Sequence, residues 1–78
     1  MDIPIIDLEG SGLTEDEILT NFYGPENRSK SGWANGEYLA HKEWCQKEAA
    51  LFIKRGRNVG IVKNAQGHIA LFEKKEIK

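Results

Sequence analysis

The fold is decided by residues 37–73, EYLAHKEWCQKEAALFIKRGRNVGIVKNAQGHIALFE, which contain a helical pattern followed by two apolar runs. In the first part, apolar side chains recur at the three-to-four spacing of an amphipathic helix. The side chains that follow this spacing are Tyr38, His41, Cys45, Ala49, Phe52 and Ile53. Gly56 comes directly after the pattern and is typical of the position just past a helix end. We therefore predict one long helix over residues 37–55.

The second part of this stretch predicts a β-hairpin. Two short apolar runs, residues 59–62 and 68–72, are separated by Asn64-Ala65-Gln66-Gly67. Asn at the first and Gly at the last turn position suit a type I turn. The hairpin is therefore expected to span residues 58–73, and the charged residues 74–78 are expected to fray.

Residues 1–12 are predicted to form an extended acidic arm or an edge strand. Pro4 lies inside the short apolar run of residues 3–8, and proline cannot donate a hydrogen bond to a strand ladder. Gly10-Ser11-Gly12 then interrupts the pattern.

A short helix is predicted for residues 14–23. Thr14 and Glu17 have the spacing of a capping box, and three successive acids suit the positive end of a helix dipole. Gly24-Pro25 ends this helix, because the residue before a proline resists helical conformation. Residues 24–36 are rich in Gly, Ser, Asn and Pro, and they predict a long loop.

These elements predict a single small α+β domain over residues 1–78. The long helix packs on a small antiparallel sheet built on the C-terminal hairpin, and the short N-terminal helix covers one edge. The expected core consists of Ile18, Leu19, Phe22, Leu39, Cys45, Ala49, Phe52, Ile61, Ile69 and Leu71.

The order of the elements allows two comparisons. A long helix followed by a hairpin resembles the end of a winged-helix domain, but that fold needs two further helices, and residues 24–36 are poor helix material. A βαββ unit fits better, and its extra strand lies either in residues 3–8 or near Trp33. Neither comparison implies a function.

Composition excludes several classes of protein. The chain has 78 residues, with 40% hydrophobic and 29% charged residues, as in ordinary globular domains. No apolar run approaches the roughly 18 residues of a membrane span, and the N-terminus lacks the basic region of a secretory signal. The single Cys45 allows no intrachain disulfide, so we predict a cytoplasmic protein without membrane association.

Charge is distributed unevenly along the chain. Residues 1–26 carry seven acids and no Lys or Arg, whereas residues 27–78 carry the other five acids and all 11 bases. Two interpretations remain open. Either the acidic segment folds against the basic one, or the basic part presents a binding surface.

Catalysis and metal binding are not predicted. His41 and Cys45 share one helix face, and His68 could approach from the hairpin, but no second cysteine supports a zinc site. Cys45 lacks the motif of a catalytic nucleophile. Gly10-Ser11-Gly12 lacks the lysine and hydroxyl residue of a phosphate loop. We therefore expect no enzyme activity, no cofactor and no bound metal.

The leading hypothesis is a small non-enzymatic protein-interaction module, a regulator or inhibitor that occupies a partner's surface. An exposed loop tryptophan such as Trp33 is a typical interface anchor, although it could instead cover the small core. The predicted contact residues are Trp33, Arg28, Lys30, Arg55 and Arg57. Compact accessory proteins of this kind are frequent products of phages and mobile elements. A homodimer through an open sheet edge is a further expectation.

The alternative hypothesis is a nucleic-acid-binding domain. Its predicted contacts are the bases around the helix end and the hairpin, namely Lys54, Arg55, Arg57, Lys63, Lys74 and Lys75. Such a cluster would bind phosphates, and binding would weaken as salt rises. The isoelectric point near 6.1 is far below the basic values typical of nucleic-acid-binding domains.

Overall fold

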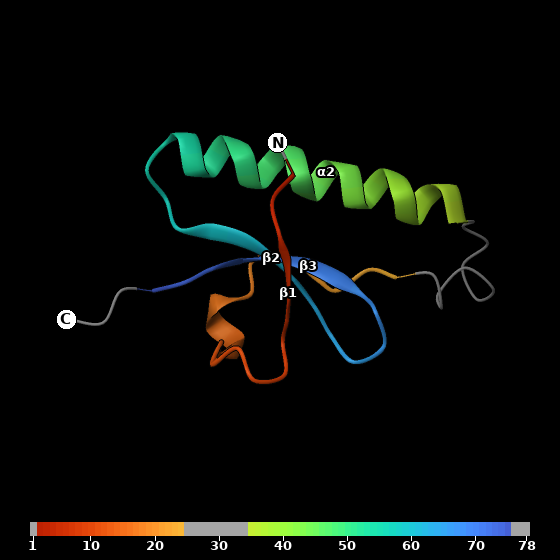
Figure 1. Ribbon diagram of the computed structural model, residues 1–78, viewed down its shortest axis with the longest axis horizontal. Helices are drawn as coiled ribbons and strands as arrows, with labels where there is room; N and C mark the ends of the chain where they lie inside the picture. Colours follow the sequence, from red (N-terminus) through yellow and green to blue (C-terminus); the bar gives the residue numbers. More distant parts are fainter. Residues whose placement is uncertain (1, 25–34, 76–78) are drawn as a thin grey trace.

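The computed structural model describes residues 2–24 and 35–75. In chain order its elements are β1 (Ile5–Asp7), the 3-10 turn η1 (Glu15–Glu17), α2 (Asn35–Lys54), β2 (Val59–Lys63) and β3 (Ile69–Glu73). The chain is an α+β fold in which one long helix lies along one face of a three-stranded sheet (Figure 1). This is the βαββ arrangement, and β1 is its extra strand.

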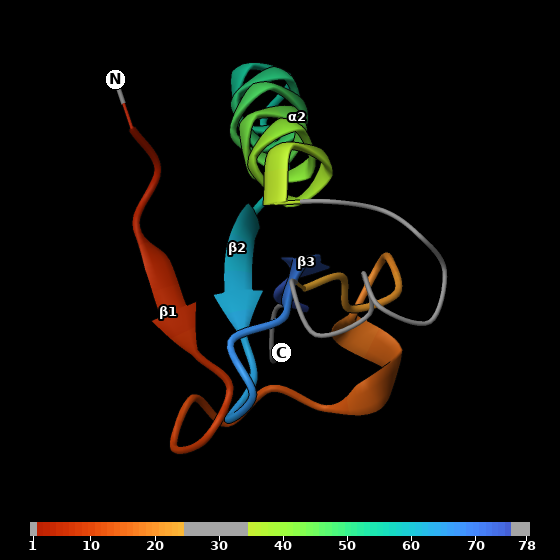
Figure 2. The same ribbon diagram turned by 90° about the vertical axis from the view of Figure 1, so that its right-hand side faces the viewer.

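The sheet has the order β1-β2-β3 and is mixed. β1 runs parallel to β2, with Ile5 opposite Ile61, whereas β2 and β3 form an antiparallel pair with Ile61 opposite Leu71. The purely antiparallel sheet expected from the sequence is therefore wrong. The sheet is mixed because α2 supplies the long crossover connection that the parallel pair of β1 and β2 requires. Figure 2 shows the strands side by side with α2 above them.

The hairpin between β2 and β3 turns at residues 64–67. The Gly67 N–H donates to the Asn64 carbonyl at 3.0 Å, and Gly67 has a φ of +86°, which favours glycine. The Asn64 side-chain oxygen accepts the N–H groups of Gln66 and His68, at 3.1 and 2.9 Å. Asn64 and Gly67 therefore fix this turn through their own chemistry.

The short helix predicted for residues 14–23 is wrong beyond its first turn. The capping contact is present, because the Thr14 N–H donates to the Glu17 carboxylate at 2.8 Å. However, the turn ends at Glu17, and Ile18 is extended, with φ −81° and ψ 119°. Tyr23 exchanges backbone hydrogen bonds with Ile69 of β3, both at 3.0 Å. Pairing along the outer edge of β3 thus outweighs the local helix signal.

The hairpin formed by β2 and β3 is buried on both faces. The cluster on the α2 face consists of Cys45, Ala49, Val59, Ile61, Ile69 and Leu71. On the other face, Val62, Ala70 and Phe72 meet Leu8, Leu13, Ile18 and Phe22. The first four residues of β2 and of β3 are consequently all buried. Coverage of both faces explains why these strands are continuous apolar runs and not alternating ones.

The predicted core contains Cys45, Ala49, Ile61, Ile69 and Leu71 of the α2 face but omits Val59 of that cluster, and two of its members need correction. Leu39 and Leu19 are 55% and 41% exposed. Leu39 lies off the side of α2 that meets the sheet, and Leu19 belongs to the extended segment that replaces the predicted helix. The sequence analysis also omits Val62, Ala70 and Phe72, because it assigns only one buried face to the hairpin.

The end of the described chain is tied to the η1 turn. The Lys75 N–H donates to the Glu17 carboxylate at 2.9 Å, and the Lys74 N–H donates to the Asn58 carbonyl at 3.0 Å. Two of the residues predicted to fray are therefore bonded, and residues 76–78 lie outside the described chain.

Hydrogen bonds from the Thr14 and Lys75 N–H groups hold the pKa of Glu17 below its ordinary 4.5. The ionised Glu17 carboxylate therefore stabilises the fold above its ordinary pKa. This stabilisation is lost as the pH falls through the lower pKa that the carboxyl has in the folded protein.

Gly60 allows β2 to pass beneath the ring of Phe72. A Cβ at position 60 would lie 2.7 Å from Cζ of Phe72. We expect Gly60→Ala to lower the free energy of unfolding by about 1–3 kcal/mol, the range for an overpacked core. Urea denaturation measures this change. In a Phe72→Leu background Gly60→Ala should lower the free energy of unfolding by at most half as much. Strictly additive effects of the two substitutions on the free energy of unfolding would contradict the proposed contact.

Candidate functional site

Three predicted contact residues, Arg28, Lys30 and Trp33, lie outside the described residues. The other two, Arg55 and Arg57, lie just after α2, and they differ in their surroundings. The Arg57 guanidinium donates to the Glu73 carboxylate at 2.9 and 2.6 Å and lies 4.5 Å over the Phe52 ring. This pairing lowers the pKa of the Glu73 carboxyl. Arg57 therefore has a structural role, although it is exposed, as Arg55 is.

The fold divides the predicted basic cluster. Lys54, Arg55, Arg57, Lys74 and Lys75 belong to the end of the molecule where α2 and β3 end and β2 begins, whereas Lys63 ends β2 on the far side. A hollow of about 400 Å³ at the first end has Arg57, Lys74 and Lys75 in its lining. The C-terminal carbonyls of α2 lie at this same end, and their partial negative charge opposes anion binding.

Acids from the N-terminal segment neutralise part of this basic charge. Lys75 pairs with Asp16 at 2.6 Å, and Lys63 pairs with Asp7 at 3.6 Å. The hydrogen bond from Lys75 lowers the pKa of Asp16 to about 2. The acidic segment thus folds against basic residues, so the uneven charge of the sequence is partly cancelled in space.

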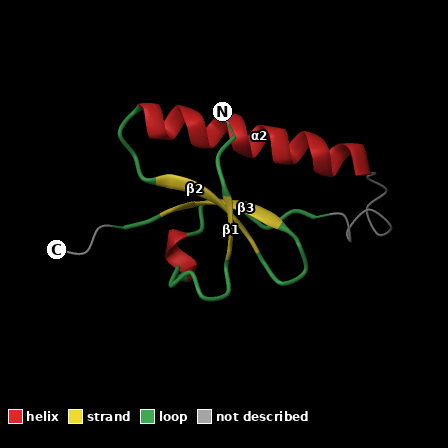
Figure 3. Ribbon diagram, in the orientation of Figure 1, coloured by secondary structure: helices red, strands yellow, loops and turns green. Residues whose placement is uncertain are grey.

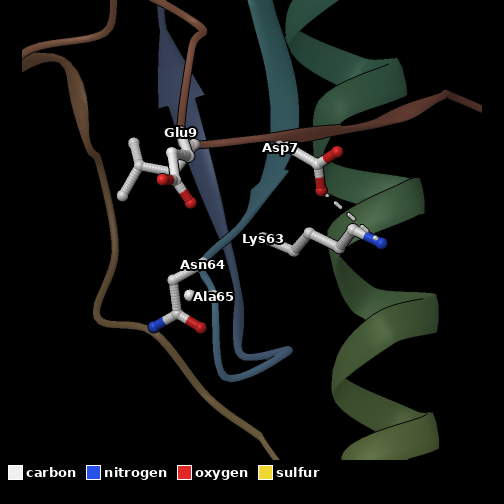
Figure 4. Close-up of a pocket in the computed structure, with 6 residues that line it drawn as sticks. Asp7, Glu9, Lys63, Asn64 and Ala65 are labelled. Carbon is white, nitrogen blue, oxygen red and sulfur yellow. Dashed lines mark ion pairs between the residues drawn. The ribbon is translucent and has the colours of Figure 1, made fainter.

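A polar hollow of about 250 Å³ lies where the parallel strands β1 and β2 end (Figure 4). Figure 4 shows Asp7 and Lys63 reaching toward each other from the two strands, with Glu9 and Asn64 beside them. The side chains of Asp7 and Lys63 are 72% and 48% exposed. An ion pair this exposed contributes little, and the Asn64 oxygen is already used by the turn. These groups are therefore better explained by local structure than by ligand binding.

Buried Cys45 and half-buried His41 form a neutral pair. The Cys45 sulfur lies 3.6 Å from Nε2 of His41. Burial raises the pKa of the Cys45 thiol to about 11 and lowers the pKa of His41. Both shifts favour the uncharged forms, which is the opposite of an activated nucleophile. Among the described residues, no group of three His, Cys, Asp or Glu side chains could hold a metal ion.

The most distinctive surface feature is an apolar hollow between α2 and residues 2–4, which precede β1 and are called the N-terminal arm from here on. Its volume is about 470 Å³. Its apolar walls are Ile3 and Pro4 on one side and Ala50 and Ile53 on the other, with Asp2 and Lys54 completing the lining. The spacing of Ile53 places it with the core-facing side chains, yet it is 48% exposed. Sequence reasoning therefore missed this site.

Gln46 ties the arm to α2 beside this hollow. Its Oε1 accepts the Ile3 N–H at 2.6 Å, and its Nε2 donates to the Ile3 carbonyl at 2.9 Å. One side-chain amide thus satisfies both backbone groups of a single residue, as a neighbouring strand would. Gln46 lies one helical turn before Ala50, so the contact that holds the arm adjoins the opposite wall. No local sequence signal links positions 43 residues apart.

No family model, curated protein or solved structure matches the chain. Within the described ranges, no helix is long and apolar enough to cross a membrane. α2, with its 20 residues, carries charged side chains along its length.

We expect Cys45 to be unreactive in the folded protein. A rise in its pKa from 9.0 to about 11 reduces the thiolate fraction on the order of 100-fold, and burial adds a steric block. Labelling with iodoacetamide at mildly alkaline pH, followed by mass spectrometry, measures the rate with and without urea. Modification of the native protein as fast as the unfolded one would contradict the buried, protonated thiol.

Proposed function

We propose that the protein is a non-enzymatic protein-interaction module that regulates or inhibits a partner by occupying part of its surface. The observation that carries this proposal is the apolar hollow between the N-terminal arm and α2. Concave, mainly apolar sites with a few polar groups at their borders are typical binding sites. Asp2 and Lys54 supply charges of opposite sign, and these favour one orientation of the bound segment.

The partner chemistry that fits is an extended segment with an apolar anchor. β1 follows the arm directly, and in the described sheet it has a neighbour on one side only. Its outer backbone edge is therefore available for pairing with an added strand. A segment that pairs with β1 could place an apolar side chain between Pro4 and Ile53. Ile6 of β1, 37% exposed, adds apolar surface beside the same edge.

The contacts expected from the sequence have different places in this proposal. Arg55 follows Lys54 at the end of α2, so it would contact the partner at the periphery of the hollow. Arg57 is bound to Glu73 and supports the fold. Trp33, Arg28 and Lys30 remain predicted contacts, and they lie outside the described residues.

Filling the hollow should weaken partner binding without unfolding the protein. Ala50 is an exposed helical residue, and arginine is a good helix former, so Ala50→Arg should leave the unfolding free energy nearly unchanged. We expect its affinity for the partner to fall by at least ~10-fold, which is about 1.4 kcal/mol. The partner is identified by affinity capture with the wild-type chain and then titrated as purified protein by isothermal calorimetry.

The matched control for this experiment is Ala40→Arg. It makes the same substitution at another exposed position of the same helix, nearly three turns before Ala50 and about 80° away around the helix axis. It should bind the partner like the wild-type chain. Equal binding by Ala50→Arg and Ala40→Arg would show that the hollow is not the docking site.

Nucleic-acid binding is the second candidate, and one observation favours it. The hollow beside the end of β3 has Arg57, Lys74 and Lys75 in its lining. Against it, Arg57, Lys63 and Lys75 are each paired with an acid of this chain. A phosphate would have to compete with those acids and with the negative end of the α2 dipole.

We expect labelled mixed-sequence DNA and RNA to show no saturable binding in fluorescence anisotropy, at either about 50 or about 200 mM salt. Strong binding at low salt that falls steeply at high salt would favour the nucleic-acid candidate instead. In that event the double variant Arg55→Glu with Lys74→Glu should abolish nucleic-acid binding, because it places two negative charges beside the phosphates. The fold should be unaffected, because neither substitution removes one of the ion pairs described above.

A further inference from the structure

The outer edge of β1 presents unpaired backbone groups within the described part of the chain. β1 runs parallel to β2, and in such a ladder alternate residues direct their N–H and C=O groups toward the neighbouring strand. The Leu8 N–H donates to the Lys63 carbonyl at 2.7 Å, so Leu8 and Ile6 are the residues that face β2. Ile5 and Asp7 therefore direct their N–H and C=O groups outward, where β1 has no neighbour in the described sheet (Figure 2).

This free edge is short and has a boundary at each end. At its start, both backbone groups of Ile3 are bonded to the Gln46 side chain. At its end, the Leu8 carbonyl accepts the N–H and the hydroxyl of Ser11, at 3.1 and 2.7 Å. Figure 3 shows the same limits, since the arm rises from β1 to α2 and a loop turns away after the strand. The two outward-facing residues between these boundaries offer their N–H and C=O groups to an incoming strand.

The side chains along this edge change from apolar to acidic. Ile5 packs on the cluster of the α2 face, and Asp7 shares that face because side chains alternate along a strand. Ile5 comes two residues after Ile3, which lines the apolar hollow. Asp7, 72% exposed, lines the polar hollow together with Glu9 and Lys63. The charged groups of that lining are two acids and one base, so this end of the edge has an excess of negative charge.

We propose that the partner segment recognised at this edge pairs antiparallel with β1 and carries, from its N-terminal end, one basic and two apolar side chains. The proposal rests on the function proposed above and specifies the partner chemistry of the same site. The basic side chain lies opposite Asp7, the middle one opposite Ile6 and the last one opposite Ile5. Charge complementarity fixes the first position, since the basic group balances the excess acid of the polar hollow.

The two apolar positions follow from the faces of the sheet. A side chain opposite Ile5 points to the α2 face, and its diagonal neighbour is Ile3, at the ~7–8 Å that a long side chain spans. This position therefore leads into the apolar hollow. A side chain opposite Ile6 lies on the other face, where Ile6 is 37% exposed and gains an apolar neighbour.

The shortness of the edge favours the antiparallel direction. In an antiparallel pair, Ile5 and Asp7 each exchange two hydrogen bonds with the residue directly opposite, so a partner segment of about three residues makes all the bonds. A parallel strand bonds on either side of the opposite residue, so the same bonds would extend over about five partner residues. Its outer residues would reach positions opposite Pro4 and Leu8, beside the boundaries of the free edge.

A second copy of the chain fits this edge less well. Two β1 strands related by a two-fold axis would pair with Ile6 opposite Ile6 of the partner subunit. Asp7 would then lie opposite Ile5 of the partner subunit. A carboxylate would occupy the position that leads into the apolar hollow, and no base would face Asp7. The homodimer through a sheet edge that the sequence predicts is therefore an alternative outcome of the test.

Peptide titration followed by NMR tests the proposal. The probe is the capped peptide threonine-arginine-valine-leucine-threonine, added at about millimolar concentration to the isotope-labelled full chain. We expect saturable binding, with the largest shifts at the amides of Ile5 and Asp7. N-methylation of the peptide's leucine should abolish binding, because that N–H donates to the Ile5 carbonyl. N-methylation of its valine should leave binding unchanged, since the valine N–H points away from β1.

Charge exchange makes the test specific for the basic position. A peptide with glutamate in place of arginine should bind the wild-type chain at least ~10-fold more weakly, and Asp7→Lys should reverse this preference. Asp7→Lys should remain folded, because the ion pair that it removes is highly exposed. Circular dichroism measures this.

Four results would overturn the proposal. They are the absence of saturable binding, equal binding of the arginine and glutamate peptides by the wild-type chain, and equal binding of the two methylated peptides. The fourth is concentration-dependent broadening of the Ile5 and Asp7 amides without peptide, which would favour the homodimer.

The strand proposal and the proposed function can fail separately. With a purified partner, Ala50→Arg tests docking at the hollow, whereas Asp7→Lys tests the edge. A partner that binds Ala50→Arg weakly but Asp7→Lys as tightly as the wild type would support the proposed function and overturn the strand proposal. A partner that binds both variants like the wild type, while the peptide still binds as expected, would overturn the proposed function and support the edge as a strand-binding site.

Discussion

The hairpin formed by β2 and β3 must be buried on both faces, and the rest of the structure depends on this constraint. Within residues 2–24 and 35–75 there is one long helix, α2, and it covers one face of the hairpin. The other face is covered by the segment between β1 and Tyr23, which contributes Leu8, Leu13 and Ile18. That segment has to remain extended to reach both sides of the hairpin, so it joins β1 to one edge and pairs with β3 at the other.

Local signals in the sequence are sufficient where the structure is local. The periodic pattern predicts α2 to within two residues at either end, and Asn64 with Gly67 predicts the hairpin turn. The capping box of Thr14 and Glu17 is an equally clear signal, but it produces only one turn because bonds to β3 compete with it. The parallel placement of β1 has no local signal, since it depends on a crossover through the whole of α2.

The candidate site is harder to predict, because it depends on a contact between positions far apart in the sequence. It also depends on a helix residue that lies at the border of the side of α2 that faces the core. Gln46 has no feature that marks it as a partner of Ile3. Ile53 shares the spacing of the core side chains, yet it lies beside the hollow. α2 carries apolar groups on more than one side, so its sequence has almost no net amphipathic direction. This pattern is expected of a helix that meets both the sheet and the arm.

The Gln46 contact has a consequence for how such a protein can change. Its hydrogen bonds reach only the backbone N–H and carbonyl of Ile3, so they do not depend on which side chain stands at that position. The Ile3 side chain also packs against the core, so its identity matters for folding. Asp2 and Pro4 are exposed, so these two residues can be exchanged while the arm stays where it is. New side chains at these two positions would reshape one wall of the hollow and leave the buried hairpin untouched, so recognition can diversify in this way with little effect on folding.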